Sequence, residues 1–170
     1  MGGKISVKSI EGQGSNFTLS LTLLAGVENR MNQTTVSGVG VKRNYQRRVL
    51  LSEDNVVNQK ITSAMLERLG VETDIASNGK VCLELLRKRT YDLVLMDVHM
   101  PELDGLETTR RIRSLNDEVS KVPVIAMTAS VLESDYIKCM EVGMDRFIAK
   151  PVNFAALINH LDHYFSSSAV

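Results

Sequence analysis

Hydrophobic and polar positions divide the chain into two patterned regions and an unpatterned stretch between them. Over residues 1–24 apolar and polar residues alternate, first at Ile5 and Val7 and then at Phe17, Leu19, Leu21 and Leu23. Period-two alternation on both sides of a Gly- and Ser-containing turn predicts a β-hairpin. A two-stranded hairpin is only marginally stable alone in water, so we expect it to pack against another surface.

Residues 25–41 are small and polar without sustained periodicity, and we predict a linker over residues 25–46. Basic residues, among them Arg43 and Arg47, surround its end. We interpret them as a solvated approach to the next strand rather than as a nucleic-acid patch.

From residue 47 to residue 166 the pattern becomes strand then helix, repeated five times, before a short tail at 167–170. The apolar runs that predict strands are 49–51, 71–76, 93–96, 122–127 and 147–149. In the first helix Val57, Ile61, Met65 and Leu69 recur every four residues and predict its apolar face. The fourth helix is marked by Leu132, Tyr136, Cys139 and Met140.

Five strand–helix units joined by short loops predict an α/β fold with a parallel sheet and helices on both faces. The strand at 71–76 alternates in polarity and the strand at 147–149 is short, so both suit sheet edges. We therefore predict a flavodoxin-like (βα)5 fold with strand order 2-1-3-4-5, preceded by the hairpin.

The composition argues against several classes of function. The 170 residues carry 20 basic and 20 acidic side chains and no Trp, which argues against binding to nucleic acid or to a membrane surface. Cys82 and Cys139 have no metal-ligand spacing and indicate free thiols in a reducing compartment. No apolar run approaches the roughly 20 residues of a membrane span. We expect this fragment to be cytoplasmic. This expectation is compatible with a parent protein that is anchored in a membrane.

Polar residues end the predicted strands: Glu53 and Asp54, Asp97, Thr128, and Lys150. Carboxyl ends of parallel strands meet at one edge of a sheet, where such folds bind ligands. Three crowded carboxylates repel one another unless a cation neutralises them, and an all-oxygen set suits Mg²⁺. A lysine and a hydroxyl opposite the metal would stabilise a transferring phosphoryl group, and a carboxylate can be its nucleophile.

The motifs Glu53-Asp54-Asn55, Met96-Asp97 through Gly105, Thr128-Ala129 and Lys150-Pro151 together resemble the receiver domain of two-component response regulators. The resemblance implies that Asp97 accepts a phosphoryl group from phosphohistidine. It also implies that Asp54, Asp97 and the Val98 carbonyl bind Mg²⁺, with Glu53 acting through water, and that Lys150 and Thr128 contact the phosphoryl oxygens. Phe147 and Thr128 would be switch residues, and His99 and Ser130 would tune the rate of phosphoryl loss. The Lys150–Pro151 peptide would be cis.

Asn55, Asn58, Gln59 and Lys60 resemble the start of the first helix in receivers of hybrid histidine kinases. Residues 1–24 resemble the last hairpin of a histidine-kinase ATP-binding domain. The ATP-binding boxes and the phosphorylated histidine of that family do not occur in the sequence, so we expect no kinase activity from this fragment. The expected partner is a phosphohistidine on a histidine kinase or a histidine phosphotransfer domain. The oligomeric state stays open, and a dimer is one arrangement.

Two alternatives remain. A pseudo-receiver would bind partners without being phosphorylated, although the full set of acids, Thr128 and Lys150 argues against it. A Mg²⁺-dependent phosphohydrolase with an Asp nucleophile usually has a second acid two positions later, where this sequence has His99.

Overall fold

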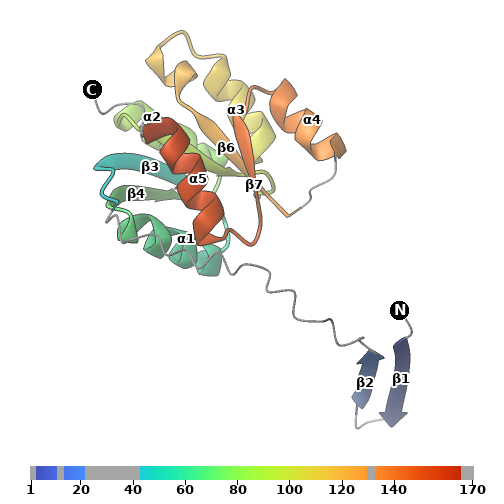
Figure 1. The fold of residues 1–170 in the computed structure, drawn as a ribbon. Coiled ribbons are helices and arrows are strands. Elements are labelled where there is room, and N and C mark those ends of the chain that lie inside the picture. The colour runs from blue at the N-terminus through green and yellow to red at the C-terminus, as the bar shows by residue number, and fades with distance from the viewer. Residues whose placement is uncertain (1–2, 11–13, 22–42, 130–132, 166–170) are drawn as a thin grey trace. The chain divides into compact units, whose positions relative to one another are not determined.

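The computed structural model describes residues 3–10, 14–21, 43–129 and 133–165 and divides the chain into two units, Met1–Val41 and Lys42–Val170. The first unit contains the predicted hairpin, in which β1 (Gly3–Ile10) pairs antiparallel with β2 (Gly14–Leu21) (Figure 1). Ile5 is 73% exposed within this unit, as expected for a hairpin that needs a further surface to cover it.

The second unit, called the α/β unit below, alternates strands and helices as predicted. Its elements are β3 (Arg47–Ser52), α1 (Val56–Arg68), β4 (Val71–Ala76), α2 (Gly79–Lys88), β5 (Leu93–Asp97), α3 (Gly105–Arg113), the 3-10 helix η1 (Glu118–Lys121), β6 (Val124–Thr128), α4 (Glu133–Glu141), β7 (Arg146–Ala149) and α5 (Phe154–Phe165). The strands form one parallel sheet in the order β4-β3-β5-β6-β7. This confirms the predicted order 2-1-3-4-5 for the five strands of the unit.

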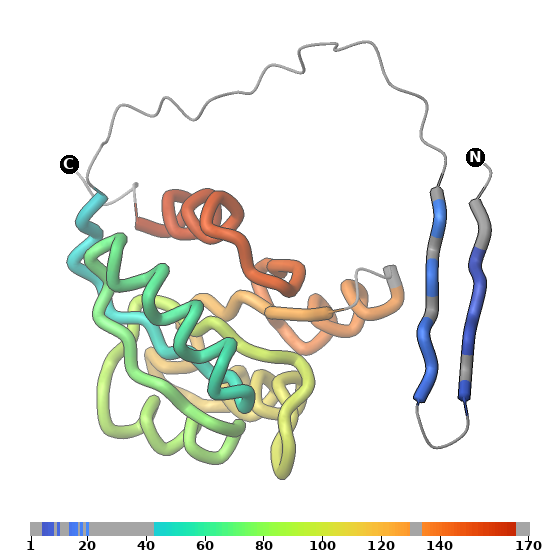
Figure 2. The backbone as a smooth tube through the Cα atoms, turned by 90° about the horizontal axis from the view of Figure 1, so that it is seen from below, coloured from blue at the N-terminus to red at the C-terminus, as the bar shows by residue number. Residues whose placement is uncertain are grey.

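Two apolar cores cover the two faces of this sheet. Helices α1 and α5 supply one core, through residues such as Leu66 and Leu161, and α2, α3 and α4 supply the other, through residues such as Cys82, Ile112 and Cys139 (Figures 1 and 2). All five residues of β5 are buried, because this central strand has helices on both sides. The position of Asp97 is therefore fixed by a strand that packing holds on both faces.

The predicted face of α1 is partly wrong. Val57 and Ile61 are 63% and 48% exposed, whereas Thr62, Leu66 and Leu69 are buried. An i, i+4 row drifts by about 40° per step around a helix of 3.6 residues per turn, so a row that is buried at Leu69 has rotated into solvent by Val57. The exposed apolar side chains at the start of α1 lie next to the acid pair.

Residues 43–46, called the approach segment below, precede β3 within the α/β unit and contact its other elements. The Arg43 guanidinium donates two hydrogen bonds to the Asp162 carboxylate of α5, at 3.1 and 2.9 Å. The Tyr45 hydroxyl donates to the same carboxylate, and the Tyr45 N–H donates to the Leu69 carbonyl at 3.1 Å. Arg43 is thus paired with α5 while its side chain stays 37% exposed, so the approach is solvated but also anchored at this residue. The predicted domain limits themselves remain predictions.

Several predicted features lie outside the described residues. These are the hairpin turn at 11–13, the linker up to residue 42, Ser130, Leu132 and the tail at 167–170.

Candidate functional site

Four of the predicted side chains meet at the carboxyl edge of the sheet. Glu53, Asp54 and Asp97 each offer a carboxylate oxygen, and these oxygens lie within 4.8 Å of one another. Lys150 Nζ bridges two of the acids, at 2.6 Å from Glu53 Oε2 and 2.7 Å from Asp97 Oδ2. Glu53 and Asp97 are 1% and 4% exposed, while Asp54 is exposed. The strand ends therefore build one acidic cluster with a lysine on it, as predicted.

Local chain geometry presents these groups. The Asn55 side chain accepts hydrogen bonds from the N–H groups of Val57 and Asn58 and so begins α1 immediately after the acid pair. Beyond Asp97 the chain folds back so closely that a Cβ on Gly105 would collide with the Asp97 carbonyl. Only glycine fits at this close approach. Asp104 then caps α3 by accepting the Glu107 N–H at 2.7 Å.

Burial dominates the electrostatics of Asp97. Burial raises the pKa of Asp97 above its ordinary value, and the hydrogen bonds from Lys150 and from the His99 N–H only partly offset this effect. Burial also acts to lower the pKa of Lys150, but its hydrogen bonds to Asp97 and Glu53 outweigh it, so that this pKa is raised. Lys150 is therefore firmly charged, and Asp97 is a buried carboxylate that an additional cation would stabilise.

The donor set fits a hard divalent cation. It consists of oxygen atoms alone, and one of the three acids, Asp54, is open to solvent. Mg²⁺ prefers oxygen ligands and retains several waters, so a site with one exposed carboxylate suits it. With three carboxylates and one lysine the cluster carries a formal charge of −2, which a divalent cation would neutralise.

The remaining predicted residues lie around this cluster. Thr128 ends β6 and is buried, and its carbonyl accepts the Lys150 N–H at 2.7 Å. Phe147 lies on β7, is 38% exposed and stacks edge-on against Tyr136 with ring centroids 5.3 Å apart. His99 is exposed, and the Val98 carbonyl accepts the Gly105 N–H at 3.0 Å. The Lys150–Pro151 peptide is cis, as predicted.

Two amide side chains at this site were not predicted to belong to it. The Asn58 amide donates to Glu53 Oε1 at 3.1 Å, and the Gln59 amide donates to the Glu53 carbonyl at 2.6 Å. The sequence motif contains both residues, but helical spacing alone does not show that they face the acid pair.

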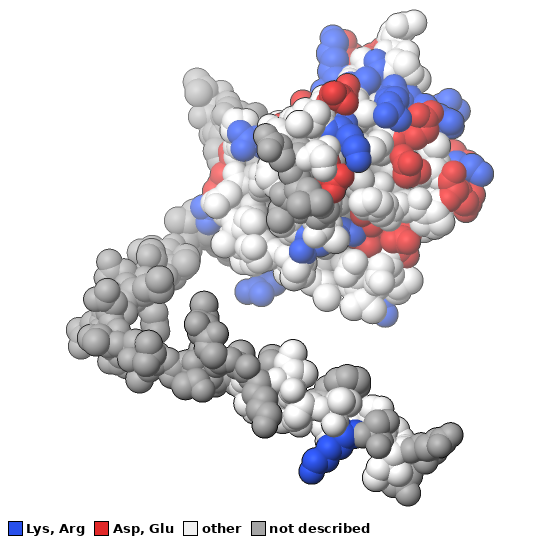
Figure 3. All heavy atoms as spheres, turned by 90° about the vertical axis from the view of Figure 1, so that its right-hand side faces the viewer, with Lys and Arg blue, Asp and Glu red and all other residues white. Residues whose placement is uncertain are grey.

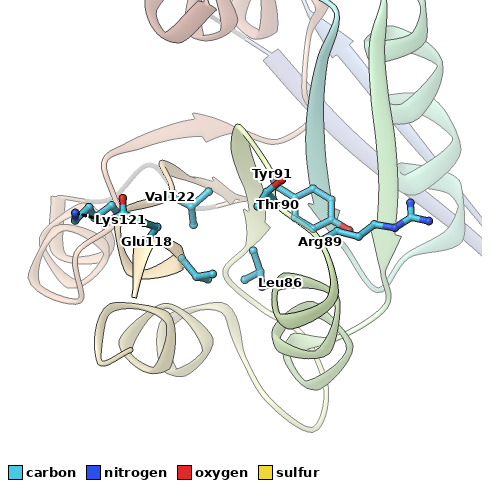
Figure 4. A pocket seen from close by; sticks show the side chains of 8 residues that line it. Leu86, Arg89, Thr90, Tyr91, Glu118, Lys121 and Val122 are labelled. Atoms are coloured by element: carbon cyan, nitrogen blue, oxygen red, sulfur yellow. Dashed lines mark hydrogen bonds and ion pairs between the residues drawn. The ribbon is translucent and has the colours of Figure 1, made fainter. Parts of the chain in front are cut away.

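A separate cavity of about 350 Å³ lies near the opposite ends of β5 and β6 (Figure 4). It is lined by Leu86, Arg89, Thr90, Tyr91, Glu118, Val119, Lys121 and Val122. Arg89 pairs with Asp74 and Lys121 with Glu118, so its charged residues are already engaged. This cavity does not offer the acid–lysine chemistry of the strand-end cluster.

The surface is mixed in charge and the thiols are buried. On the face in Figure 3, basic and acidic side chains of the α/β unit are interspersed. Cys82 and Cys139 are both free and buried, and burial raises the pKa of Cys82 to about 12. Among the described residues, the helices are too short or too polar to cross a membrane.

Comparison with known proteins identifies the class. The sequence profile of the response regulator receiver domain matches residues 49–162, so the chain belongs to the receiver-domain family of two-component signal transduction. Over 166 residues, 92% of the chain, it is 34% identical to hybrid signal transduction histidine kinase K of Dictyostelium discoideum. The chain spans only 14% of the length of that kinase.

Solved structures agree with this assignment. The receiver domain of sensor histidine kinase PA1611 from Pseudomonas aeruginosa, which has a magnesium ion coordinated in its active-site cleft, is 37% identical with a TM-score of 0.66, covering 71% of this chain and 98% of that domain. The receiver domain of Ssk1 from Saccharomyces cerevisiae, solved with the histidine phosphotransfer protein Ypd1, is 27% identical with a TM-score of 0.66, covering 73% of this chain and 92% of that chain.

Proposed function

We propose that the α/β unit is a phosphoacceptor that takes a phosphoryl group from phosphohistidine onto Asp97. The observation that carries the proposal is the position of Lys150, whose Nζ contacts the buried Asp97 at 2.7 Å beside two further carboxylates. In the proposed step an Asp97 oxygen attacks phosphorus, a P–O bond forms, the P–N bond to the donor imidazole breaks, and the imidazole nitrogen takes up a proton.

Asp54, Asp97 and the Val98 carbonyl would hold Mg²⁺, with Glu53 acting through water. When bound, the ion would neutralise charge on the carboxylates and on the phosphoryl oxygens. The Val98 carbonyl accepts the Gly105 N–H with one lone pair and would offer its second lone pair to the ion. Lys150 would pair with a phosphoryl oxygen and Thr128 would bond to another.

The proposed switch connects the site to the far edge of the sheet. Thr128 pairs in register with Ala149 of β7, two residues after Phe147. If Thr128 moves toward the phosphoryl group, space opens for Phe147 to leave Tyr136 and rotate inward. The face of α4, β7 and α5 would change, and a partner that reads this face would respond. His99 and Ser130 are proposed to tune phosphoryl loss.

A histidine phosphotransfer domain or a histidine kinase is the proposed partner. The start of α1 offers exposed Val56, Val57 and Ile61 next to the acid pair, an apolar surface on which a partner could place its histidine. The Ssk1 receiver was solved bound to such a protein. We further propose that the fragment comes from a cytoplasmic part of a hybrid histidine kinase and that β1 and β2 end its ATP-binding domain, since the match to the Dictyostelium kinase covers 92% of the chain.

Incubation with acetyl phosphate and Mg²⁺, followed by intact mass measurement, tests this proposal. We expect a gain of one phosphoryl group that is labile to base and is absent with EDTA and in Asp97→Asn. Absence of any gain in the parent chain would support a pseudo-receiver instead. Continuous phosphate release at enzyme-like turnover would indicate a phosphohydrolase.

A further inference from the structure

Both oxygens of the Glu53 carboxylate have partners, and these partners come from different parts of the fold. Oε1 accepts hydrogen bonds from the Asn55 N–H at 3.2 Å and from the Asn58 amide at 3.1 Å. Oε2 pairs with Lys150 Nζ at 2.6 Å. The residue is 1% exposed, so these protein groups replace the water that would otherwise solvate its charge.

The Asn58 amide is not required to begin α1. Asn55 already caps this helix by accepting the N–H groups of Val57 and Asn58. The Asn58 side chain is half-buried and instead lines a cavity of about 60 Å³ that it shares with Glu53, Lys150 and Pro151. Its donor therefore serves the acidic cluster rather than the helix end.

Phosphorylation of Asp97 would require Lys150 to change partners. In the structure its ammonium is shared between Glu53 and Asp97, at 2.6 and 2.7 Å, whereas the proposed function needs it on the phosphoryl oxygens. A buried carboxylate that loses its cation is costly unless other donors remain. Among the residues that the structure describes, the donors that remain on Glu53 are the Asn55 N–H and the Asn58 amide.

We propose that Asn58 is a positioning residue: its amide holds the Glu53 carboxylate oriented toward Mg²⁺ while Lys150 moves to the phosphoryl group. The inference rests on the proposed function and deepens it. A neutral amide suits this role because a cation at Asn58 would compete with Mg²⁺ for Glu53. An apolar side chain there would leave Oε1 with the Asn55 N–H as its one donor among the described residues.

The test compares Asn58→Leu, which removes the donor at similar size, with Asn58→Gln, which retains an amide. Asn116→Leu is the matched control, because Asn116 is exposed in the turn between α3 and η1. Mg²⁺ affinity is measured by titration calorimetry on the unphosphorylated chain, and the phosphorylation rate by intact mass at saturating Mg²⁺ with acetyl phosphate. Leucine favours helix more than asparagine does, so the Leu variant is expected to fold, and circular dichroism checks this.

For Asn58→Leu we expect Mg²⁺ affinity to fall about fivefold and the phosphorylation rate about tenfold, which is within the net contribution of one typical intramolecular hydrogen bond. Asn58→Gln should recover most of both losses, and Asn116→Leu should match the parent. The proposal is overturned if Asn58→Leu behaves like the control, if Asn58→Gln is as impaired as Asn58→Leu, or if the parent chain binds no Mg²⁺. If the parent binds Mg²⁺ but is not phosphorylated, the proposed function fails, and the affinity comparison still decides whether Asn58 positions Glu53.

Discussion

Replacing Lys150 with Met should destabilise the α/β unit and should make its stability depend on Mg²⁺. The substitution keeps most of the side-chain stem but removes the ammonium that pairs with Glu53 and Asp97. Both carboxylates then remain in nearly dry positions, with side-chain exposures of 2% and 6%. Their mutual repulsion is no longer offset by the lysine.

The size of the effect follows from this geometry. Breaking a buried ion pair by removing one partner costs about 3–5 kcal/mol. The lower end applies here, because the Lys150 side chain is 17% exposed and burial already favours the protonated form of Asp97 by raising its pKa. An unfolding entropy of about 2.1 cal/mol/K per residue over roughly 120 residues gives about 0.25 kcal/mol/K, so a loss of about 3 kcal/mol lowers Tm by about 12 °C.

Thermal unfolding followed by circular dichroism measures this change at neutral pH, first with EDTA and then with saturating Mg²⁺. Mg²⁺ should raise the Tm of Lys150→Met more than that of the parent, because the ion takes over the charge neutralisation that the lysine provided. Lys121→Met is the matched control, since Lys121 is 72% exposed and pairs with Glu118 at the surface; its Tm should change by about 1 °C at most. A drop below about 3 °C in Lys150→Met, or an equal Mg²⁺ effect on parent and variant, would refute the reasoning.

Three further predictions address pH, the approach segment and the hairpin. Burial raises the folded-state pKa of Asp97, so its ionisation costs stability at neutral pH, and this cost disappears as pH falls through the raised pKa. Asp97→Asn should therefore have a higher Tm than the parent near pH 7 and lose this advantage in acid. Calorimetry at a series of pH values would show this. Asp162→Asn should cost about 1 kcal/mol, because Arg43 and Tyr45 lose a partly exposed charged acceptor; faster amide exchange at Tyr45 would confirm it, and unchanged exchange would count against it. Removing residues 1–40 should leave the Tm of the α/β unit within about 1 °C of the parent, since the chain divides at Val41; a larger drop in calorimetry would show that the hairpin supports the second unit.

The strand order of the sheet could be predicted because the hydrophobic pattern of each strand indicates how far that strand is buried. β5 is an uninterrupted apolar run and is buried throughout, and the alternating β4 lies at an edge. The buried face of α1 could not be predicted from a four-residue spacing, because that spacing drifts around the helix and the sheet covers only part of the row. Which apolar residues face the sheet depends on how the helix is placed, and this is decided by packing between elements distant in sequence.

The site shows the same division between local and distant information. Glu53, Asp54, Asp97 and Lys150 were predictable because parallel topology brings strand ends together whatever the loops do. The pairing of Arg43 with Asp162 was not, because it joins residues 119 positions apart through side chains that could equally have stayed in solvent. The direction of the Asn58 amide belongs to the same class, since it follows from the position of α1 relative to β3.

Charge balance links these observations to the proposed function. Without a metal, the cluster of three carboxylates and Lys150 carries a formal charge of −2, and the lysine is divided between Glu53 and Asp97. A phosphoryl group brings about two further negative charges, so it would enter a site that repels it unless a divalent cation is already present. Mg²⁺ would both cancel this repulsion and release Lys150 from the acids that now hold it. Phosphorylation should therefore require Mg²⁺ even with an excess of phosphodonor. The Lys150→Met variant should bind the ion without competition from the lysine. It should still be phosphorylated slowly, because it lacks the cation that pairs with the incoming phosphoryl oxygens.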